Sequence, residues 1–518
     1  MEVSHISRQG QSAIQNRWSS LQRRHQRLRR KHERATEALA TAQQQLLAAG
    51  ETIRRLEQTI ACKQVEIEAH SQQRQQGQTG YFRDPAVYGH RYAASMIALC
   101  VNLANVMPLR TIPKALQIIL SVLGIKTLVP NRETITRWCK RLGLDRVTQN
   151  QTSPRLKSRS DMIWIVDHSN QIGTQKVLVI LGIPASELPA LNETLSLDKL
   201  EVLMVRPGES WTRDDVRAVY RELAAQIGCP RWVLCDGAVE LRESVDALCD
   251  EHHTSDVLRD FKHFAANRFE SLIGRSEEFQ RFLSAMGKTR CLVQQTELAH
   301  LTPPSLKTKA RFMNIEPMIA WGEMILAVLE DPRAPQSGVL NVAKLEQRLG
   351  WLREYREQIA SWKRCCDVIG SSLWWINTHA LQRDTQQQLR GWLEPQRVDR
   401  CELSDRMFEL LLEFLVSSSS GLGTGERAWL SSEVLESVFA LFKRREGQQS
   451  RSGFTGLIVS LPTLLRSWSA AEVRAGLRRT DMETVNQWVE QTVGATLWSK
   501  RAQAFAHFGK KCPKFQPL

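Results

Sequence analysis

The sequence lacks an apolar run long enough to cross a bilayer, which takes about 20 residues. Its longest apolar stretch, Ala93 to Val106, is shorter than that and contains the polar residues Asn102 and Asn105. The opening residues, MEVSHISRQGQ, contain no apolar signal core. These absences argue against a membrane protein, and we expect no membrane partner and a cytoplasmic location.

Cysteine pairs with metal-ligand spacing are also missing. The 11 cysteines are scattered and odd in number, and apart from the neighbours Cys365 and Cys366 they form no close pair and no CxxC. This excludes a zinc ribbon and a disulfide framework, and it favours a reducing compartment.

Basic residues, by contrast, are in excess. Lys and Arg number 70 against 55 Asp and Glu, and the pI is near 9.5. This balance favours a polyanionic partner such as nucleic acid, although a solvated basic surface would give the same composition. A length of 518 residues indicates several domains.

The first 75 residues predict a long helix. Between Ile14 and His70 there is no proline and one glycine, Gly50. Apolar residues recur every seven positions, with a second set three positions later, as in a coiled coil that oligomerises. An intramolecular helical arm is the alternative. The two sets are Leu39, Leu46, Ile53, Ile60 and Ile67, and Ala42, Ala49 and Leu56.

Residues 76–150 predict a helix-turn-helix domain. After a linker rich in Gln and Gly come three helical segments, the last being PNRETITRWCKRLGL, with Asn131 placed to cap it. Ile135, Trp138 and Leu142 would hold this helix to its neighbours. A plain three-helix bundle would have a similar pattern. In the DNA-binding interpretation, the residues facing the major groove are Arg132, Thr134, Arg137, Lys140 and Arg141.

Residues 160–274 predict an α/β core. Three strand-like segments, a helix that ends at Gly228 and a further strand follow one another, and a second helix, strand and helix come after them. The strand-like segments DMIWIVD and RWVLCD end at Asp167 and Asp236, where an open sheet exposes side chains to ligands. Either aspartate alone could be a turn former or a helix cap.

The remaining chain predicts helices. Residues 275–425 are rich in tryptophan and suit an all-helical insertion, and residues 426–518 contain the helix SSEVLESVFALFKRRE and a helical tail. Early in that helix lies Glu436, with Glu433 as a competing acid. Three carboxylates without sulfur or imidazole ligands favour Mg²⁺ or Mn²⁺, and two such ions suit displacement at phosphorus.

This order of acids and elements resembles the RNase H-like DDE transposases of the retroviral-integrase superfamily over roughly residues 160–450. The helical insertion is the layout of its hAT-like and Mutator-like branches. A D-x-x-H motif is present as Asp260 and His263, and an E-S element with a base seven positions on is present as Glu436, Ser437 and Lys443.

The resemblance implies that Asp167, Asp236 and Glu436 are the catalytic acids and hold two ions of Mg²⁺ or Mn²⁺, supported by Asp260, His263 and Lys443. His263 could instead be an ordinary surface or core histidine. In the hAT-like relatives an aromatic side chain from the insertion stacks on a flipped base. Candidates here are Trp374 and Trp375, with core packing as the alternative, and Arg444 and Arg445 would contact phosphates or solvent.

We therefore expect a multidomain α and α/β protein that is a DNA transposase. It would bind double-stranded transposon ends and target DNA as a homo-oligomer and act in association with DNA, at the nucleoid in a bacterium. One alternative is a transposase-derived regulator or scaffold that binds DNA without cleaving it. Another is a structure-selective nuclease of the same fold, for which the helix-turn-helix would be unnecessary.

Overall fold

A computed structural model of the chain separates it into two compact units, residues 1–83 and 84–518. It describes residues 82, 84, 86–87, 89–172, 175–208, 210–252, 255–305, 311–331, 342–446, 456–494 and 503. The predicted coiled coil of residues 1–75 therefore lies outside the described residues.

The centre of the second unit is a mixed five-stranded sheet with strand order β3-β2-β1-β4-β5. Strands β1 and β2 pair antiparallel, as do β2 and β3, whereas β4 runs parallel to both β1 and β5. The five predicted strands are thus present, although β1 runs past its predicted end at Asp167. The strands are β1 (Met162–Ile172), β2 (Gln175–Pro184), β3 (Glu201–Gly208), β4 (Trp232–Cys235) and β5 (Asp256–Arg259).

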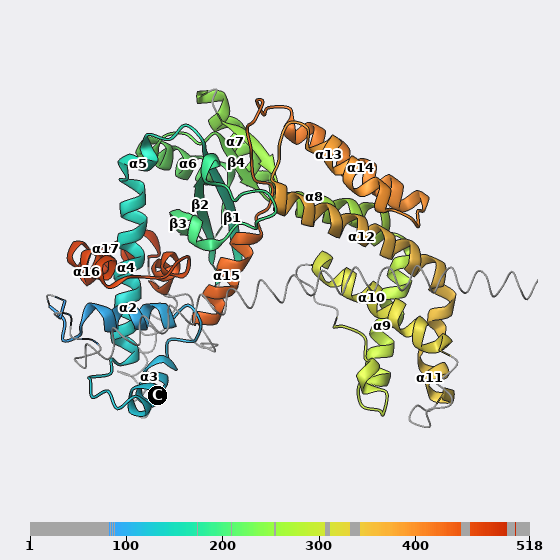
Figure 1. The fold of residues 1–518 in the computed structure, drawn as a ribbon, viewed down its shortest axis with the longest axis horizontal. Helices are drawn as coiled ribbons and strands as arrows, with labels where there is room; N and C mark the ends of the chain where they lie inside the picture. The colour runs from blue at the N-terminus through green and yellow to red at the C-terminus, as the bar shows by residue number, and fades with distance from the viewer. Residues whose placement is uncertain are drawn as a thin grey trace, which may run out of the picture. The chain divides into compact units, whose positions relative to one another are not determined.

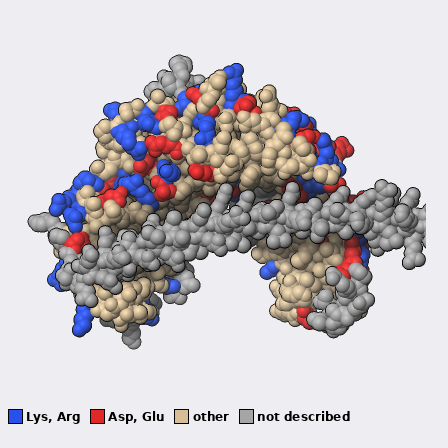
Figure 2. Space-filling model, in the orientation of Figure 1, with Lys and Arg blue, Asp and Glu red and all other residues tan. Residues whose placement is uncertain are grey.

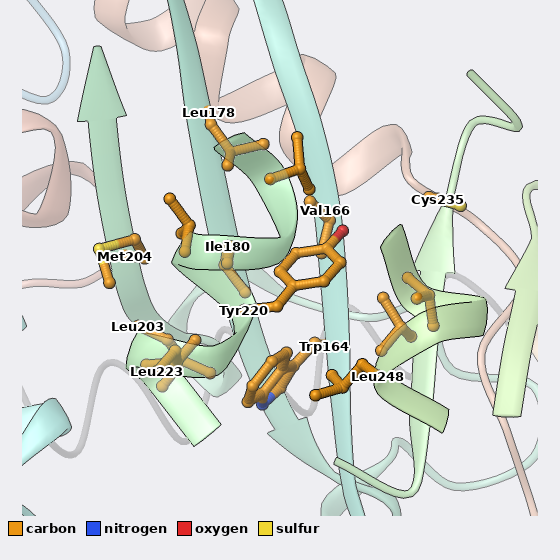
Figure 3. Close-up of a cluster of buried hydrophobic side chains, with 14 of the residues drawn as sticks. Trp164, Val166, Leu178, Ile180, Leu203, Met204, Tyr220, Leu223, Cys235 and Leu248 are labelled. Atoms are coloured by element: carbon orange, nitrogen blue, oxygen red, sulfur yellow. The ribbon is translucent and has the colours of Figure 1, made fainter. Parts of the chain in front are cut away.

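Helix α6 (Arg213–Ile227) connects β3 to β4, and helix α7 (Val239–His252) connects β4 to β5. Both helices cover the same face of the sheet. Figure 3 shows the core that results, where Trp164 and Val166 of β1 meet Tyr220 of α6. Successive strand residues point to opposite faces, so the even-numbered side chains of β1 enter this core and Asp167 lies on the other face. Each fully buried large side chain contributes about 1.5–3 kcal/mol.

The predicted helix-turn-helix region is helical, and Asn131 caps its third helix by accepting from Thr134 N at 2.8 Å. Ile135, Trp138 and Leu142 are buried, as the sequence predicted. The third helix runs past its predicted end because Asn150 donates to Val202 O of β3 at 2.9 Å. These helices are α2 (Ala94–Leu103), α3 (Ile112–Val122), α4 (Arg132–Gln151) and α5 (Pro154–Lys157).

A long helical segment separates β5 from the last part of the fold (Figure 1). Within it α12 packs on α10 and α14, and both α12 and α14 contact α8. Its main elements are α8 (Phe261–Phe269), the π-helical turn η3 (Glu270–Gly274), α9 (Glu277–Val293), α10 (Arg311–Glu330), α11 (Val342–Leu349), α12 (Arg356–His379), α13 (Thr385–Leu393) and α14 (Glu402–Ser419).

After this segment the chain returns to the sheet, where α15 contacts β1 (Figure 1). Of the last elements, η8, α16 and α17 pack on α4, and α15 packs on η8. They are α15 (Glu433–Glu446), η8 (Gly456–Leu464), α16 (Ala470–Arg479) and α17 (Met482–Thr492). The described part is thus mostly helical around one mixed sheet. It contains no helix long and apolar enough to cross a membrane.

Charged side chains of both signs are interspersed on the face of the molecule shown in Figure 2. Ion pairs in the described part of the chain include Arg206 with Glu222 at 2.7 Å and Arg213 with Glu243 at 3.2 Å.

Candidate active site

Three aspartates lie next to one another where the parallel strands end. Val166 of β1 is in register with Cys235 of β4, and Cys235 with Arg259 of β5. An aspartate follows each of these residues, namely Asp167, Asp236 and Asp260. The sheet register therefore places all three at the carboxyl edge of its parallel part, where open α/β sheets bind ligands.

The prediction that Asp167 ends its strand is wrong, because β1 continues to Ile172. Antiparallel pairing with β2 extends the strand, and Asp167 is the register partner of Val179. The parallel neighbour β4 does stop, at Cys235. Asp167 therefore lies within a continuous strand, whereas the neighbouring strand β4 ends just before Asp236.

Asp167 and Asp236 form a half-buried pair of like charge. Burial, together with the charge of Asp236, raises the pKa of Asp167 to about 7. Asp167 also accepts from His168 N at 2.6 Å, and Asp236 accepts from Ala238 N at 2.8 Å, so both carboxylates are fixed by nearby backbone. Two carboxylates held together in this way would be stabilised by a cation between them.

Asp260 joins the sheet, α8 and α15. Its backbone N–H donates to Cys235 O at 2.8 Å, and its carboxylate accepts from Ser432 N at 2.5 Å and from His263 N at 2.6 Å. The D-x-x-H motif thus caps α8 and fixes the start of α15. Burial alone would raise the pKa of Asp260, but these donors and the charge of His263 hold it below its usual value.

His263 is charged at neutral pH. Its Nδ1 lies 3.0 Å from Asp260 Oδ1. Burial alone would lower the pKa of His263, but the hydrogen bond and charge of Asp260, with the charges of Asp236 and Asp167, raise it to about 9. A positive imidazole therefore stands close to the aspartate pair.

The two competing glutamates of α15 share one lysine. Lys262 Nζ lies 2.8 Å from Glu433 Oε1 and 3.2 Å from Glu436 Oε2. Burial alone would lower the pKa of Lys262, but the hydrogen bonds and charges of the two glutamates raise it. Asn377 of α12 also donates to Glu433, at 2.9 Å, so the inserted helices contribute to the site.

The donor set fits a hard cation in part. Carboxylate oxygens are what Mg²⁺ and Mn²⁺ prefer, and the pair of Asp167 and Asp236 supplies two such groups. Within the described residues, however, no three His, Cys, Asp or Glu side chains gather closely enough to hold an ion. Glu436 contacts Lys262 instead.

Of the three bases predicted to follow Glu436, Lys443 and Arg444 are exposed on α15. The prediction that Arg445 contacts DNA phosphates or solvent is wrong, because this side chain is 1% exposed. Its guanidinium donates to Ala104 O at 3.2 Å, to Ser460 O at 2.8 Å and to Asn105 Oδ1 at 2.7 Å. Arg445 thus binds α15 to the end of α2 and to η8.

The two tryptophans that are candidates for base stacking differ in exposure. Trp375 is buried and stacks on His379 with ring centroids 4.3 Å apart, so it belongs to the core, which was the stated alternative. Trp374 is 52% exposed and stacks on Trp392 at 5.4 Å. It lies one helical turn before Asn377 and hence close to Glu433.

The residues of α4 that were predicted to face the DNA groove also differ in exposure. Arg132 and Arg137 are exposed, and Thr134 is half-buried. Burial lowers the pKa of Lys140. Arg141 does not face outward as predicted, because it donates to Thr480 O at 2.6 Å, to Leu477 O and to the ring of His90.

Two features of the site were missed from the sequence. Lys262 stands inside the D-x-x-H motif, where a lysine at a helix start would ordinarily be taken as exposed. His168, next to Asp167, lies on the opposite face of β1, where its Nε2 is 2.9 Å from Glu240 Oε1. The alternation of β1 could have predicted that direction, but the contact with α7 depends on tertiary packing.

Comparisons with known proteins give little further information. No protein-family model and no curated protein matches the chain. Among solved structures, a match is the Drosophila P element transposase strand transfer complex, with a TM-score of 0.36 and 9% sequence identity. The match covers 74% of this chain and 94% of that one. A similarity this low carries no argument about function, and the inferences below rest on the residues themselves.

Proposed function

We propose that the chain is a DDE-type DNA transposase that binds transposon ends and performs metal-dependent strand cleavage and strand transfer. The observation that supports this most directly is the half-buried pair of Asp167 and Asp236 at the carboxyl edge of the parallel strands. The helix bearing Glu436 packs against the same strand, β1. In this proposal the three acids, which are far apart in the sequence, serve one site at this edge of the sheet.

Asp167 and Asp236 would hold Mg²⁺ or Mn²⁺, with Glu436 completing a two-ion site. When bound, such ions activate the attacking oxygen and stabilise the leaving oxygen in an in-line displacement at phosphorus. The same site then serves cleavage and transfer, because only the nucleophile changes, from water to a 3′-hydroxyl.

The other residues of the site have roles that follow from their charge. His263, kept positive by Asp260, would attract the scissile phosphate toward the acids. Lys443 and Arg444 would contact the DNA backbone, and Trp374 offers an exposed stacking face near the site. Arg132 and Arg137 on α4 would contact the transposon end, and residues 1–75 would join the chains of a homo-oligomer.

One observation favours a second function. Glu436 is paired with Lys262, and the described residues offer no group of three metal donors. This would suit a transposase-derived protein that binds DNA as a regulator or scaffold and does not cleave it.

Strand cleavage and transfer assays on DNA that carries the ends of the encoding element separate the two functions. The variants Asp167→Asn, Asp236→Asn and Glu436→Gln are each expected to lower activity in Mg²⁺ or Mn²⁺ at least about 100-fold while DNA binding persists. Asp214→Asn, a change at an exposed helix residue, is the matched control and is expected to remain active.

Binding without cleavage by the unmodified chain in both metals would favour the regulator and reject the enzyme. An inactive Glu433→Gln beside an active Glu436→Gln would assign the third acid to Glu433. Activity that persists in Asp167→Asn and Asp236→Asn would reject the proposed site altogether.

A further inference from the structure

Lys262 is an unusual residue to find beside a metal site. It lies in the first turn of α8 and is only 9% exposed. A positive charge there is opposed by the helix macrodipole and by burial. The two glutamates of α15, at 2.8 and 3.2 Å, offset that cost.

The two glutamates are not equivalent. Glu433 accepts from Asn377 Nδ2 at 2.9 Å and from Ser431 Oγ at 3.4 Å in addition to its contact with Lys262. For Glu436, Lys262 is the one ion-pair partner among the residues that the structure describes. Glu433 is therefore anchored on several sides, and Glu436 can change partner without breaking other ion pairs.

The charges also favour such an exchange. With both glutamates on Lys262 the three groups carry a net charge of −1. If Glu436 leaves, Lys262 and Glu433 remain as a neutral pair, so no buried charge loses its last partner. A cation at Asp167 and Asp236 would in turn attract Glu436.

We propose that Lys262 is an internal counter-ion that competes with the divalent cation for Glu436, so that the third acid joins Asp167 and Asp236 only after the cation displaces it. Lys262 is thus a positioning residue, and Glu433 is its permanent partner. This inference rests on the proposed function, because it takes the aspartate pair as the cation site. It also accounts for the absence of three gathered donors among the described residues.

The test is Mn²⁺ binding to the full chain without DNA, measured from the electron paramagnetic resonance signal of free Mn²⁺. Lys262→Met removes the competitor and is expected to tighten binding about three- to tenfold, the range that loss of a partly exposed ion pair allows. Lys344→Met, which removes the exposed ion pair with Glu297, is the matched control and should leave binding unchanged. Unchanged or weaker binding in Lys262→Met would overturn the proposal.

The double variant Lys262→Met/Glu436→Gln identifies the acid that is released. The gain in Mn²⁺ affinity should disappear in it, and should persist in Lys262→Met/Glu433→Gln. The reverse pattern would reject the assignment of Glu433 as the anchor. If Mn²⁺ affinity does not fall in Asp167→Asn and Asp236→Asn, these aspartates are not the cation site. The proposed function is then rejected, whatever the lysine variants show.

A second measurement does not depend on whether the lysine variants fold. In a crystal of the unmodified protein soaked with Mn²⁺, Glu436 should bind the ion and Lys262 should contact Glu433 alone. An ion on Asp167 and Asp236 with Glu436 still on Lys262 would contradict the competition.

Discussion

The charged groups of the candidate site are buried or half-buried and differ in how well their charges are compensated. Asp260 has His263 and two backbone donors, Glu433 has Lys262 and Asn377, and the pair of Asp167 and Asp236 has mainly backbone donors. A group whose charge is balanced within the protein contributes to folding. A group whose charge is not balanced is available to a ligand.

At the residue scale, His263 predicts a pH dependence of stability. Its pKa is raised from 6.5 to about 9 in the folded state, which therefore holds more protons than the unfolded state between these values. The stabilisation is complete below pH 6.5 and is lost as the pH rises through 9. Urea unfolding from pH 6 to 10 in chelator should show this decline, and His263→Gln should lack it. Parallel pH curves for the two proteins would show that His263 does not contribute.

At the scale of the elements, the two halves of α4 differ in what surrounds them. Its first turns present Arg132 and Arg137 to solvent, whereas its second half is covered by η8 and α16. The close approach of η8 depends on Gly143, where an added Cβ would lie 1.9 Å from Val459 O. The backbone of η8 thus occupies the space that a side chain at position 143 would need.

Gly143→Ala is therefore expected to destabilise the chain by about 1–3 kcal/mol, since backbone has to move to admit the methyl group. Gly370→Ala is the matched control, because an added Cβ at this exposed position of α12 meets nothing within 4 Å. Alanine is the better helix former, so the control should gain about 0.5–1 kcal/mol. Chemical denaturation measures both, and changes of the same sign would contradict this packing.

The exposed turns of α4 predict a salt-dependent contact with DNA. Arg132→Gln/Arg137→Gln should weaken binding to a duplex of the element's end and reduce the slope of log affinity against log salt by about two, because each phosphate contact contributes about 0.9. The control Arg281→Gln/Arg383→Gln alters two exposed arginines of the helical segment. Equal losses in both pairs would indicate nonspecific attraction by the whole surface.

At the scale of the whole molecule, Arg445 connects three parts of the chain. It is fully buried and has no acidic partner among the described residues, and it donates to Ala104 and Asn105, which follow α2, and to Ser460 of η8. The helix that bears Glu436 is thereby joined to the helices of the predicted DNA-binding region.

Arg445→Lys keeps the charge but leaves buried acceptors without donors, and each unsatisfied group costs about 1–3 kcal/mol. We expect a loss of about 3 kcal/mol in the free energy of unfolding. Arg444→Lys, at the exposed neighbouring position, should change it by less than about 0.5 kcal/mol. Similar values for the two variants would show that the buried contacts of Arg445 are not energetically important.

Prediction from the sequence succeeded where the determinant is local. The cap at Asn131 and the end of α6 at Gly228 follow from residue patterns within one segment. It failed where the determinant is a distant residue. Lys262 meets Glu433 across most of the inserted helices, and Arg445 meets Ala104 across most of the chain. Arg445 lies on the same helix face as the buried Val438 and Phe442, but the local pattern does not show the distant backbone acceptors that allow an arginine to be buried there.

The hydrogen bond from Ser432 to Asp260 closes a segment of 172 positions. A second one, from Phe261 N to Leu430 O at 2.9 Å, lies beside it. The segment between thus departs from and rejoins the sheet domain at a single point, and the entropy of closing so long a loop grows only slowly with its length. Whole helices could be gained, lost or exchanged there over evolutionary time while Asp167, Asp236 and Asp260 kept their places at the edge of the sheet.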